Sequence, residues 1–308
     1  MDRPVEAYMH VGIVQFMLYP DLQSGDGPIV ETAESLADDE FFHALEITRI
    51  NDVQERRSMR RLAESSHLTL GYGAHPQILS GALDLSSADP ELRTRSITEV
   101  KAAIDEAAEL GVSMLTLLDG PNSAPRVDET EAAVDRVVTS LTELCAHAAP
   151  HNMWVALEQF DRSIEKKSLL GPIELCVRVS EMVRASTPNF GLCLDLSHLP
   201  LLGEDPETSL RTAGAHLIQA HIGNCIARDQ DHPQYGDQHP VFGDPAGEND
   251  VPELAAYLKT LLEIGYFEQN LPTPMPLVSF EMKPASDQSA AMIIGNCKRT
   301  FQLAWAQV

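Results

Sequence analysis

The chain of 308 residues is 44% hydrophobic, which is enough for a substantial core in one large domain or two ordinary ones. Its 46 acidic residues against 22 Lys and Arg give a formal net charge of −24, and a field of that sign repels nucleic acid and anionic lipid, so we expect neither as a partner. No apolar run reaches the roughly 18 residues of a membrane span, and the start of the chain lacks the apolar core of a secretory signal, so we predict a cytoplasmic protein.

Short apolar runs alternate along the chain with longer amphipathic segments. The runs are rich in Val, Ile, Leu, Phe or Met, as strands buried on both faces are. We predict eight strands, at Val11–Leu18, Ala44–Ile47, Leu68–Gly73, Ser113–Leu118, Trp154–Glu158, Phe190–Asp195, Leu217–Ile222 and Leu277–Glu281.

Apolar residues at helical spacing predict helices between these strands. The clearest are at Pro90–Leu110, Asp128–Ala149, Gly171–Arg184, Val251–Ile264 and Ser286–Ala306. Regular alternation of strand and helix implies parallel pairing, and eight units in about 300 residues fit a closed barrel better than an open sheet. No glycine-rich GxGxxG turn follows the first strand. We therefore predict an α/β fold, a single (β/α)8 TIM barrel spanning residues 1–308.

Four consecutive predicted strands end in a carboxylate or an imidazole. These residues are Glu158, Asp195, His221 and Glu281, and the active site of a barrel lies at the C-terminal ends of its strands. Uncompensated burial of three carboxylates is costly, and a divalent cation offsets that cost. Three carboxylates and one imidazole are ligands that suit Mn²⁺, Mg²⁺ or Co²⁺. They do not resemble the thiolate ligands of a typical structural zinc site. The sequence therefore predicts a metal centre.

The same pattern resembles the xylose isomerase-like TIM barrels, a superfamily that includes sugar epimerases, sugar-phosphate isomerases and AP endonucleases of family 2. The resemblance spans essentially the whole chain and is carried by Glu158, Asp195-Leu196-Ser197-His198, His221-Ile222-Gly223-Asn224 and the Glu281 segment. It implies that Glu158, Asp195, His221 and Glu281 bind one divalent ion, with Mn²⁺ preferred and Mg²⁺ or Co²⁺ as alternatives.

The resemblance also implies a reaction. In epimerases of this family, a pair such as Glu158 and Glu281 removes a proton from one face of a ketose or related polyol and returns one to the other, through an enediolate. His198 is implied as a further catalytic residue that reaches the substrate. Glu46, at the end of the second strand, is implied as a substrate contact. Lys283 is a candidate anchor for a substrate oxyanion, with a structural salt bridge as the alternative.

The loop at residues 227–250, after the seventh strand, departs from the family. Ketose epimerases usually have an arginine six residues after the strand-seven histidine, where this chain has Ala227 and then Arg228, so we expect Arg228 to bind substrate. The loop is long and contains Pro and Gly residues. We predict a lid or a partner-facing surface there, not a second domain.

Other activities remain open at this point. Asp237-Gln238-His239 and His75 resemble additional metal ligands of AP endonucleases, but the fourth strand is followed by Asp119 near the place of a metal-binding histidine. A lyase is the main alternative to a sugar isomerase or epimerase: similar chemistry on a 3-keto-glycoside would expel an aglycone by β-elimination, as C-glycoside deglycosidase subunits do. A homo-oligomer or a small partner subunit, the substrate and the native metal also remain open.

Overall fold

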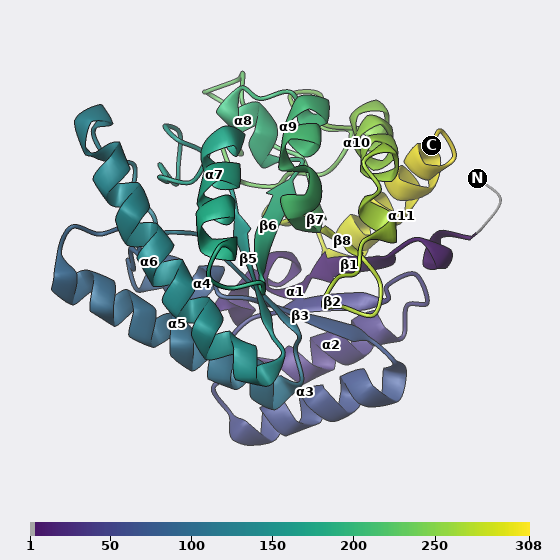
Figure 1. Ribbon diagram of the computed structural model, residues 1–308. Coiled ribbons are helices and arrows are strands. Elements are labelled where there is room, and N and C mark those ends of the chain that lie inside the picture. Colours follow the sequence, from purple (N-terminus) through teal and green to yellow (C-terminus); the bar gives the residue numbers. More distant parts are fainter. Residues whose placement is uncertain (1–3) are drawn as a thin grey trace.

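The computed structural model describes residues 4–308 and confirms the predicted (β/α)8 barrel (Figure 1). The strands are all parallel and pair in chain order, with the last pairing back to the first. They are β1 His10–Val14, β2 Ala44–Ile47, β3 Thr69–Gly73, β4 Met114–Leu117, β5 Trp154–Glu158, β6 Phe190–Asp195, β7 Leu217–Ile222 and β8 Leu277–Phe280.

A ring of helices surrounds the barrel, and short 3-10 turns lie in several of the connections. The helices are α1 Gln15–Leu18, α2 Ile29–Ala37, α3 Val53–Ser66, α4 His75–Ser80, α5 Pro90–Leu110, α6 Thr130–Ala148, α7 Ile173–Arg184, α8 His198–Leu202, α9 Pro206–Ala213, α10 Val251–Glu263 and α11 Ala290–Trp305. The 3-10 turns are η1 Val5–Ala7, η2 Pro20–Ser24, η3 Val127–Glu129, η4 Ala149–His151, η5 Gly214–His216 and η6 Tyr266–Glu268.

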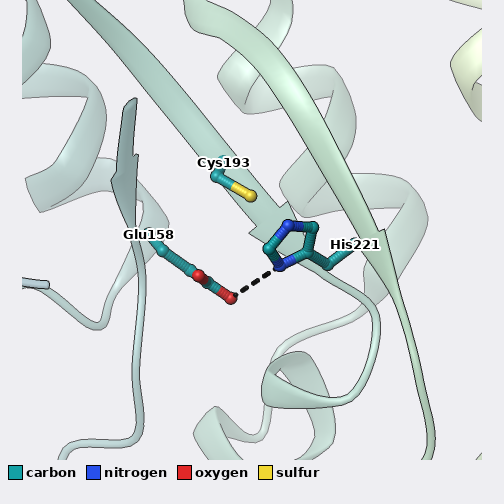
Figure 2. A group of neighbouring side chains, drawn as sticks. All are labelled: Glu158, Cys193 and His221. Carbon is teal, nitrogen blue, oxygen red and sulfur yellow. Dashed lines mark hydrogen bonds and ion pairs between the residues drawn. The ribbon is translucent and has the colours of Figure 1, made fainter. Parts of the chain in front are cut away.

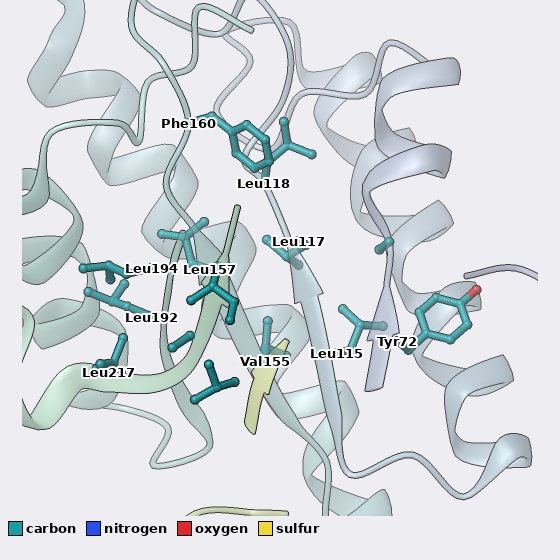
Figure 3. Packing of buried hydrophobic residues seen from close by; sticks show 14 of the residues in the cluster. Tyr72, Leu115, Leu117, Leu118, Val155, Leu157, Phe160, Leu192, Leu194 and Leu217 are labelled. Carbon is teal, nitrogen blue, oxygen red and sulfur yellow. The ribbon is translucent and has the colours of Figure 1, made fainter. Parts of the chain in front are cut away.

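The alternation of side chains along each strand separates the outer core from the interior of the barrel. On β5, Val155 and Leu157 join the large core between strands and helices, part of which Figure 3 shows. Ala156, between them, faces inward and joins a small apolar cluster contributed by several strands. That cluster consists of Ala44, Met114, Ala156, Cys193, Ile218 and Leu277. Glu158, two residues beyond Ala156, therefore lies on the inward face at the C-terminal end of the barrel.

The prediction for the first strand was wrong at its C-terminal end. We expected Val11–Leu18, but β1 ends at Val14 and the next four residues form α1. The side chain of Gln15 donates hydrogen bonds to the carbonyl of Ile29 and the hydroxyl of Thr32, both at 2.8 Å, so the chain turns toward α2. The apolar residues that follow Gln15 belong to this turn, and Phe16 lines a cavity there.

The start of the last helix also differs from the prediction. We expected Ser286–Ala306, whereas α11 begins at Ala290 because the side chain of Ser289 caps it by accepting a hydrogen bond from the backbone N of Met292. No helix among residues 4–308 combines the length and apolar character needed to cross a membrane.

Residues 223–250, every one of which the structure describes, contain no helix or strand of their own. One antiparallel bridge joins Ile226 to Gly236. The segment is nevertheless tied to the barrel, because Asn249 donates a hydrogen bond to the carbonyl of Leu196, directly after β6. Its middle part carries Asp237 and His239, both buried, to the C-terminal ends of the strands.

Candidate metal centre

The four predicted metal ligands come together at the C-terminal end of the barrel. Glu158 and Asp195 end β5 and β6, His221 lies near the end of β7, and Glu281 directly follows β8. One potential ligand atom from each residue lies within 4.8 Å of the others. All four are buried, with at most 8% of any of them exposed. The residues converge because neighbouring strands are parallel and their C-terminal ends are in register. Asp195 on β6, for example, pairs directly with His221 on β7.

His221 is the centre of the group. Its Nδ1 lies 3.3 Å from Glu158 Oε1 and 3.0 Å from Glu281 Oε2, and its Nε2 lies 3.1 Å from both carboxylate oxygens of Glu46. Figure 2 shows Glu158, Cys193 and His221 directed toward one another from neighbouring strands. If Nδ1 binds a metal, Nε2–H can donate to Glu46, an arrangement that orients many metal-binding histidines.

The hydrogen bonding of the Asp195 carboxylate shows whether these four residues fit a cation. Its Oδ1 accepts a hydrogen bond from the backbone N of Ser197 at 2.7 Å, whereas its buried Oδ2 has no hydrogen-bond partner among the described residues. Burial raises the pKa of Asp195 to about 6, against the opposing effect of His198 and His239. A buried carboxylate oxygen without a partner is costly. A cation would satisfy it, so the residues fit a divalent metal ion.

Glu158 and Glu281 have pKa values shifted in the opposite direction. Burial alone would raise the pKa of Glu158, but His221 and His75 hold it well below its usual range. Burial likewise opposes the lowered pKa of Glu281, to which His239 contributes most. Both side chains are therefore carboxylates near neutral pH, the form that binds metal and accepts protons.

His198 belongs to a second buried cluster beside the first. Its Nδ1 donates to the carbonyl of Gln159 at 2.8 Å, and its Nε2 lies 3.1 Å from Asp237 Oδ1. The Nε2 of His239 lies 2.8 Å from the same oxygen. His198 is fully buried and both of its nitrogens contact protein, whereas His239 lines the cavity above the site.

His75, a further histidine that the sequence singled out, also reaches the site. Its Nε2 lies 3.0 Å from Glu158 Oε2, although without the alignment of a hydrogen bond. Asp119 does not join it. That carboxylate accepts hydrogen bonds from Ser123, Ser168 and the backbone of the loop after β5, so it anchors that loop.

A cavity of about 550 Å³ opens above the two clusters, with Glu281 and His239 in its wall. One part of the wall is apolar and is formed by Phe16, Met17, Leu79 and Phe160. Lys283 also lines the cavity, and its Nζ donates to Gln238 Oε1 at 3.1 Å. Among the ion pairs of residues 4–308, none involves Lys283, and its hydrogen bond goes to the neutral amide of Gln238.

Two of the predicted substrate contacts do not line the cavity. Arg228 is on the surface, with its side chain 78% exposed and paired to Glu248 at 2.8 Å. Glu46 is only 1% exposed and lies behind His221. The cavity wall also includes Arg49, whose buried Nε has no hydrogen-bond partner among the described residues.

Sequence reasoning missed several residues around the site. Phe16 and Met17 were hidden in the run assigned to the first strand, and nothing in the sequence distinguished Arg49 from other basic residues. Cys193 was also missed, although it offers a ligand atom within 4.8 Å of those from Glu158 and His221. Burial raises the pKa of Cys193 well above its ordinary value, so it remains a thiol. Its place two residues before Asp195 on β6 was the available signal.

Comparisons with known proteins agree with this architecture. The family model for the xylose isomerase-like TIM barrel matches residues 34–292. The search of curated proteins found no match. Among solved structures, an L-ribulose 3-epimerase has a TM-score of 0.75 at 18% identity, covering 97% of this chain and 95% of that chain. The IolI protein, solved with a zinc atom, has a TM-score of 0.74 at 19% identity, covering 97% and 99%.

A third similar structure is that of the 3-keto-D-glucoside 4-epimerase YcjR from E. coli, with a TM-score of 0.68 at 14% identity, covering 96% of this chain and 99% of that chain. Identities this low show a shared fold. The family model matches most of the sequence, including all four predicted metal ligands. The chain belongs to the xylose isomerase-like TIM barrel family.

Proposed function

We propose that this protein is a metal-dependent sugar isomerase or epimerase that acts on a ketose or a related polyol. The observation that carries the proposal is the convergence of Glu158 and Glu281, from β5 and β8, on one nitrogen of His221. The unpartnered oxygen of Asp195 lies in the same group. The two neighbours named as sugar epimerases support the proposal.

Glu158, Asp195, His221 and Glu281 would hold one ion. Their mostly carboxylate donors favour Mn²⁺, with Mg²⁺ or Co²⁺ as alternatives, and the zinc in the IolI protein adds Zn²⁺ to the ions to be tested. When bound, such an ion supplies Lewis-acid polarisation to a carbonyl and its neighbouring hydroxyl.

The two glutamates would move the proton. Glu158 accepts a proton from the carbon beside the substrate carbonyl, which leaves an enediolate. Glu281, a carboxylate at rest, takes up a proton from water and delivers it to the opposite face, and Glu158 returns its proton to water. The lowered pKa values make both groups weak bases, so the rate depends on their fixed position beside the carbon. His198 has both nitrogens engaged, and we assign it the role of fixing Asp237 and Glu158.

The remaining substrate contacts would come from the cavity wall. His239 and Lys283 present polar atoms there, while Phe16 and Phe160 cover the less polar side of the substrate. Phe160 also packs against His198, with ring centroids 4.3 Å apart, so it links the substrate surface to the second cluster.

A lyase acting on 3-keto-glycosides is the second candidate. The cavity, at about 550 Å³, has an apolar section that gives room for an aglycone beside the sugar. The neighbour named for a 3-keto-D-glucoside supports a substrate of this type. Removal of one proton would then be followed by loss of the aglycone, so that only one of the two glutamates is needed as a base.

The test is metal removal followed by a substrate panel in D₂O. Protein stripped with EDTA and verified by elemental analysis should be inactive, and Mn²⁺ or Co²⁺ should restore turnover. Epimerisation of a ketose should place deuterium on the inverted carbon. Release of aglycone from a 3-keto-glycoside, without epimerisation, assigns the lyase. Full activity of verified metal-free protein would contradict both candidates.

A further inference from the structure

The second cluster has the composition of a metal site in its own right. Asp195, His198 and His239 each offer an atom within 4.8 Å of the others. Asp237 bridges the two histidines through its Oδ1, at 3.1 Å from His198 and 2.8 Å from His239. All four residues are buried. Imidazole nitrogens with carboxylate oxygens are ligands that bind divalent transition metals.

A cation of the protein itself is already in contact with this cluster. The Nζ of Lys166 lies 2.9 Å from Asp237 Oδ2 and 2.8 Å from Glu165 Oε1, and its side chain is only 15% exposed. Both oxygens of Asp237 are therefore engaged, one by the histidines and one by the ammonium. Among residues 4–308, no other lysine or arginine forms an ion pair with Asp237.

The position of Lys166 is fixed by the loop after β5. Its backbone N donates to Asp161 Oδ2 at 2.6 Å, and its carbonyl accepts a hydrogen bond from the backbone N of Asn122 at 2.7 Å. Glu165 Oε2 accepts a hydrogen bond from the backbone N of Asp237 at 3.0 Å, which ties the loop after β5 to the loop after β7. The ammonium is held beside Asp237 by backbone contacts as well as by charge.

We propose that Lys166 is the resident cation of the second cluster. Its ammonium supplies the positive charge that buried Asp237 requires and keeps a second divalent ion out, so the protein binds a single ion. Two cations sharing one buried carboxylate repel each other strongly at these distances. This inference rests on the proposed metal centre. Lys166 is a positioning residue, because it acts on His198 and His239 through Asp237.

The consequence concerns the chemistry of the site. With the second ion excluded, His198 and His239 remain hydrogen-bonded to Asp237, and His239 stays in the cavity wall where it can contact a substrate oxygen. Paired metal ions are suited to displacement at phosphorus. A single ion beside fixed imidazoles is instead suited to proton transfer on a carbonyl compound, in agreement with the proposed function.

The experiment counts bound ions. Metal-stripped protein is incubated with excess Zn²⁺, passed through a desalting column and measured by elemental analysis. Wild type should retain one equivalent, and Lys166→Met should retain a second. Lys166→Arg, which keeps the charge, should retain one. Lys167→Met is the matched control, because Lys167 is the exposed neighbour in the same loop, and it should also retain one.

The double variant Lys166→Met/Asp237→Asn locates the additional ion, since loss of the Asp237 charge should return the count to one. Circular dichroism and thermal melting establish folding, and Lys166→Gln provides the same test if the methionine variant does not fold. A wild type that retains two ions, or a folded Lys166→Met that retains one, overturns the inference about Lys166 but not the proposed metal centre. A wild type that retains none overturns the metal centre itself.

Discussion

Glu158 and Glu281 differ in their surroundings even though they share His221. Glu158 is 1% exposed and also lies 3.5 Å from the Nδ1 of His198. Glu281 is 8% exposed, lines the cavity and lies 3.7 Å from the Nε2 of His239. The deeper group is held by protein on most sides, whereas the shallower one is the more accessible to substrate.

We expect Glu158→Gln and Glu281→Gln each to reduce kcat by about 10²–10⁴ while leaving measurable metal affinity. Glutamine keeps the shape and a carbonyl ligand but cannot accept a proton. The measurement is turnover together with exchange of the substrate α-proton in D₂O. For an epimerase, each variant can still exchange from one face. For a lyase, one variant should lose exchange completely and the other should be nearly unaffected.

Excess Mn²⁺ separates a base from a residue that only binds metal. If saturating Mn²⁺ restores the turnover of either variant, that glutamate is a ligand and not a base. Glu99→Gln is the matched control, because Glu99 is exposed on α5 and should leave turnover unchanged.

Glu46→Gln tests the partner of His221. Both oxygens of Glu46 lie 3.1 Å from His221 Nε2, so the loss of its charge should weaken orientation of the imidazole and reduce metal affinity by about 10–100-fold. Competition with a chelator measures this. An unchanged metal affinity with a raised KM would instead assign Glu46 to the substrate.

At the scale of elements, strands were easier to predict than loops. Glu158, Asp195 and His221 each follow a buried apolar run, and parallel pairing fixes where the ends of such runs meet. Lys166 and Arg228 lie in loops, where hydrogen bonds to particular side chains determine the path of the backbone. Asp161, for example, accepts from four backbone N–H groups between residues 163 and 166. No periodicity in the sequence encodes such contacts. The lid expected at residues 227–250 stays a prediction.

Gly223 tests how closely β7 and β8 must approach at the site. A Cβ there would lie 2.7 Å from the carbonyl oxygen of Glu281 and 3.1 Å from His239 Nδ1. We expect Gly223→Ala to separate these two ends, to lower the free energy of unfolding by about 1–3 kcal/mol and to weaken metal binding. Urea denaturation and chelator competition measure the two effects.

Gly295→Ala is the control for that substitution. Gly295 lies in α11, and the closest atoms to its added Cβ belong to the flexible guanidinium of Arg299. Alanine should there be neutral or stabilise the protein by up to about 1 kcal/mol. Wild-type stability and metal affinity in Gly223→Ala would show that the strand ends tolerate separation.

At the scale of the whole molecule, the site concentrates ionisable groups inside a chain of net charge −24. Without a metal ion, protonated histidines compensate the buried carboxylates. Burial alone would lower the pKa of His239, but Glu281 and Asp237 raise it to about 9. The pKa of His198 is also raised well above its usual value, where burial is outweighed by Asp237 and Asp195.

These shifts predict that metal-free protein loses stability as the pH rises. The raised pKa of His239 gives a contribution that is fully present below about pH 6.5 and is lost as the pH rises through about 9. Asp195 acts in the same direction at lower pH, because its raised pKa of about 6 means that folded protein retains a proton the unfolded chain has released. Glu158 and Asp237, with lowered pKa values, lose their contributions only in acid.

We therefore expect the free energy of unfolding of metal-free protein to fall by about 1–3 kcal/mol between pH 6.5 and pH 9.5. Metal-loaded protein should change less, because a bound ion replaces the protons as the charge that compensates the carboxylates. Urea denaturation at both pH values, with and without Mn²⁺, measures the difference. His239→Gln should flatten the metal-free curve at its alkaline end, since the neutral amide has no proton to lose. If the free energy of unfolding depends on pH in the same way for metal-free and metal-loaded protein, the ion does not bind among these groups, whatever its effect on turnover.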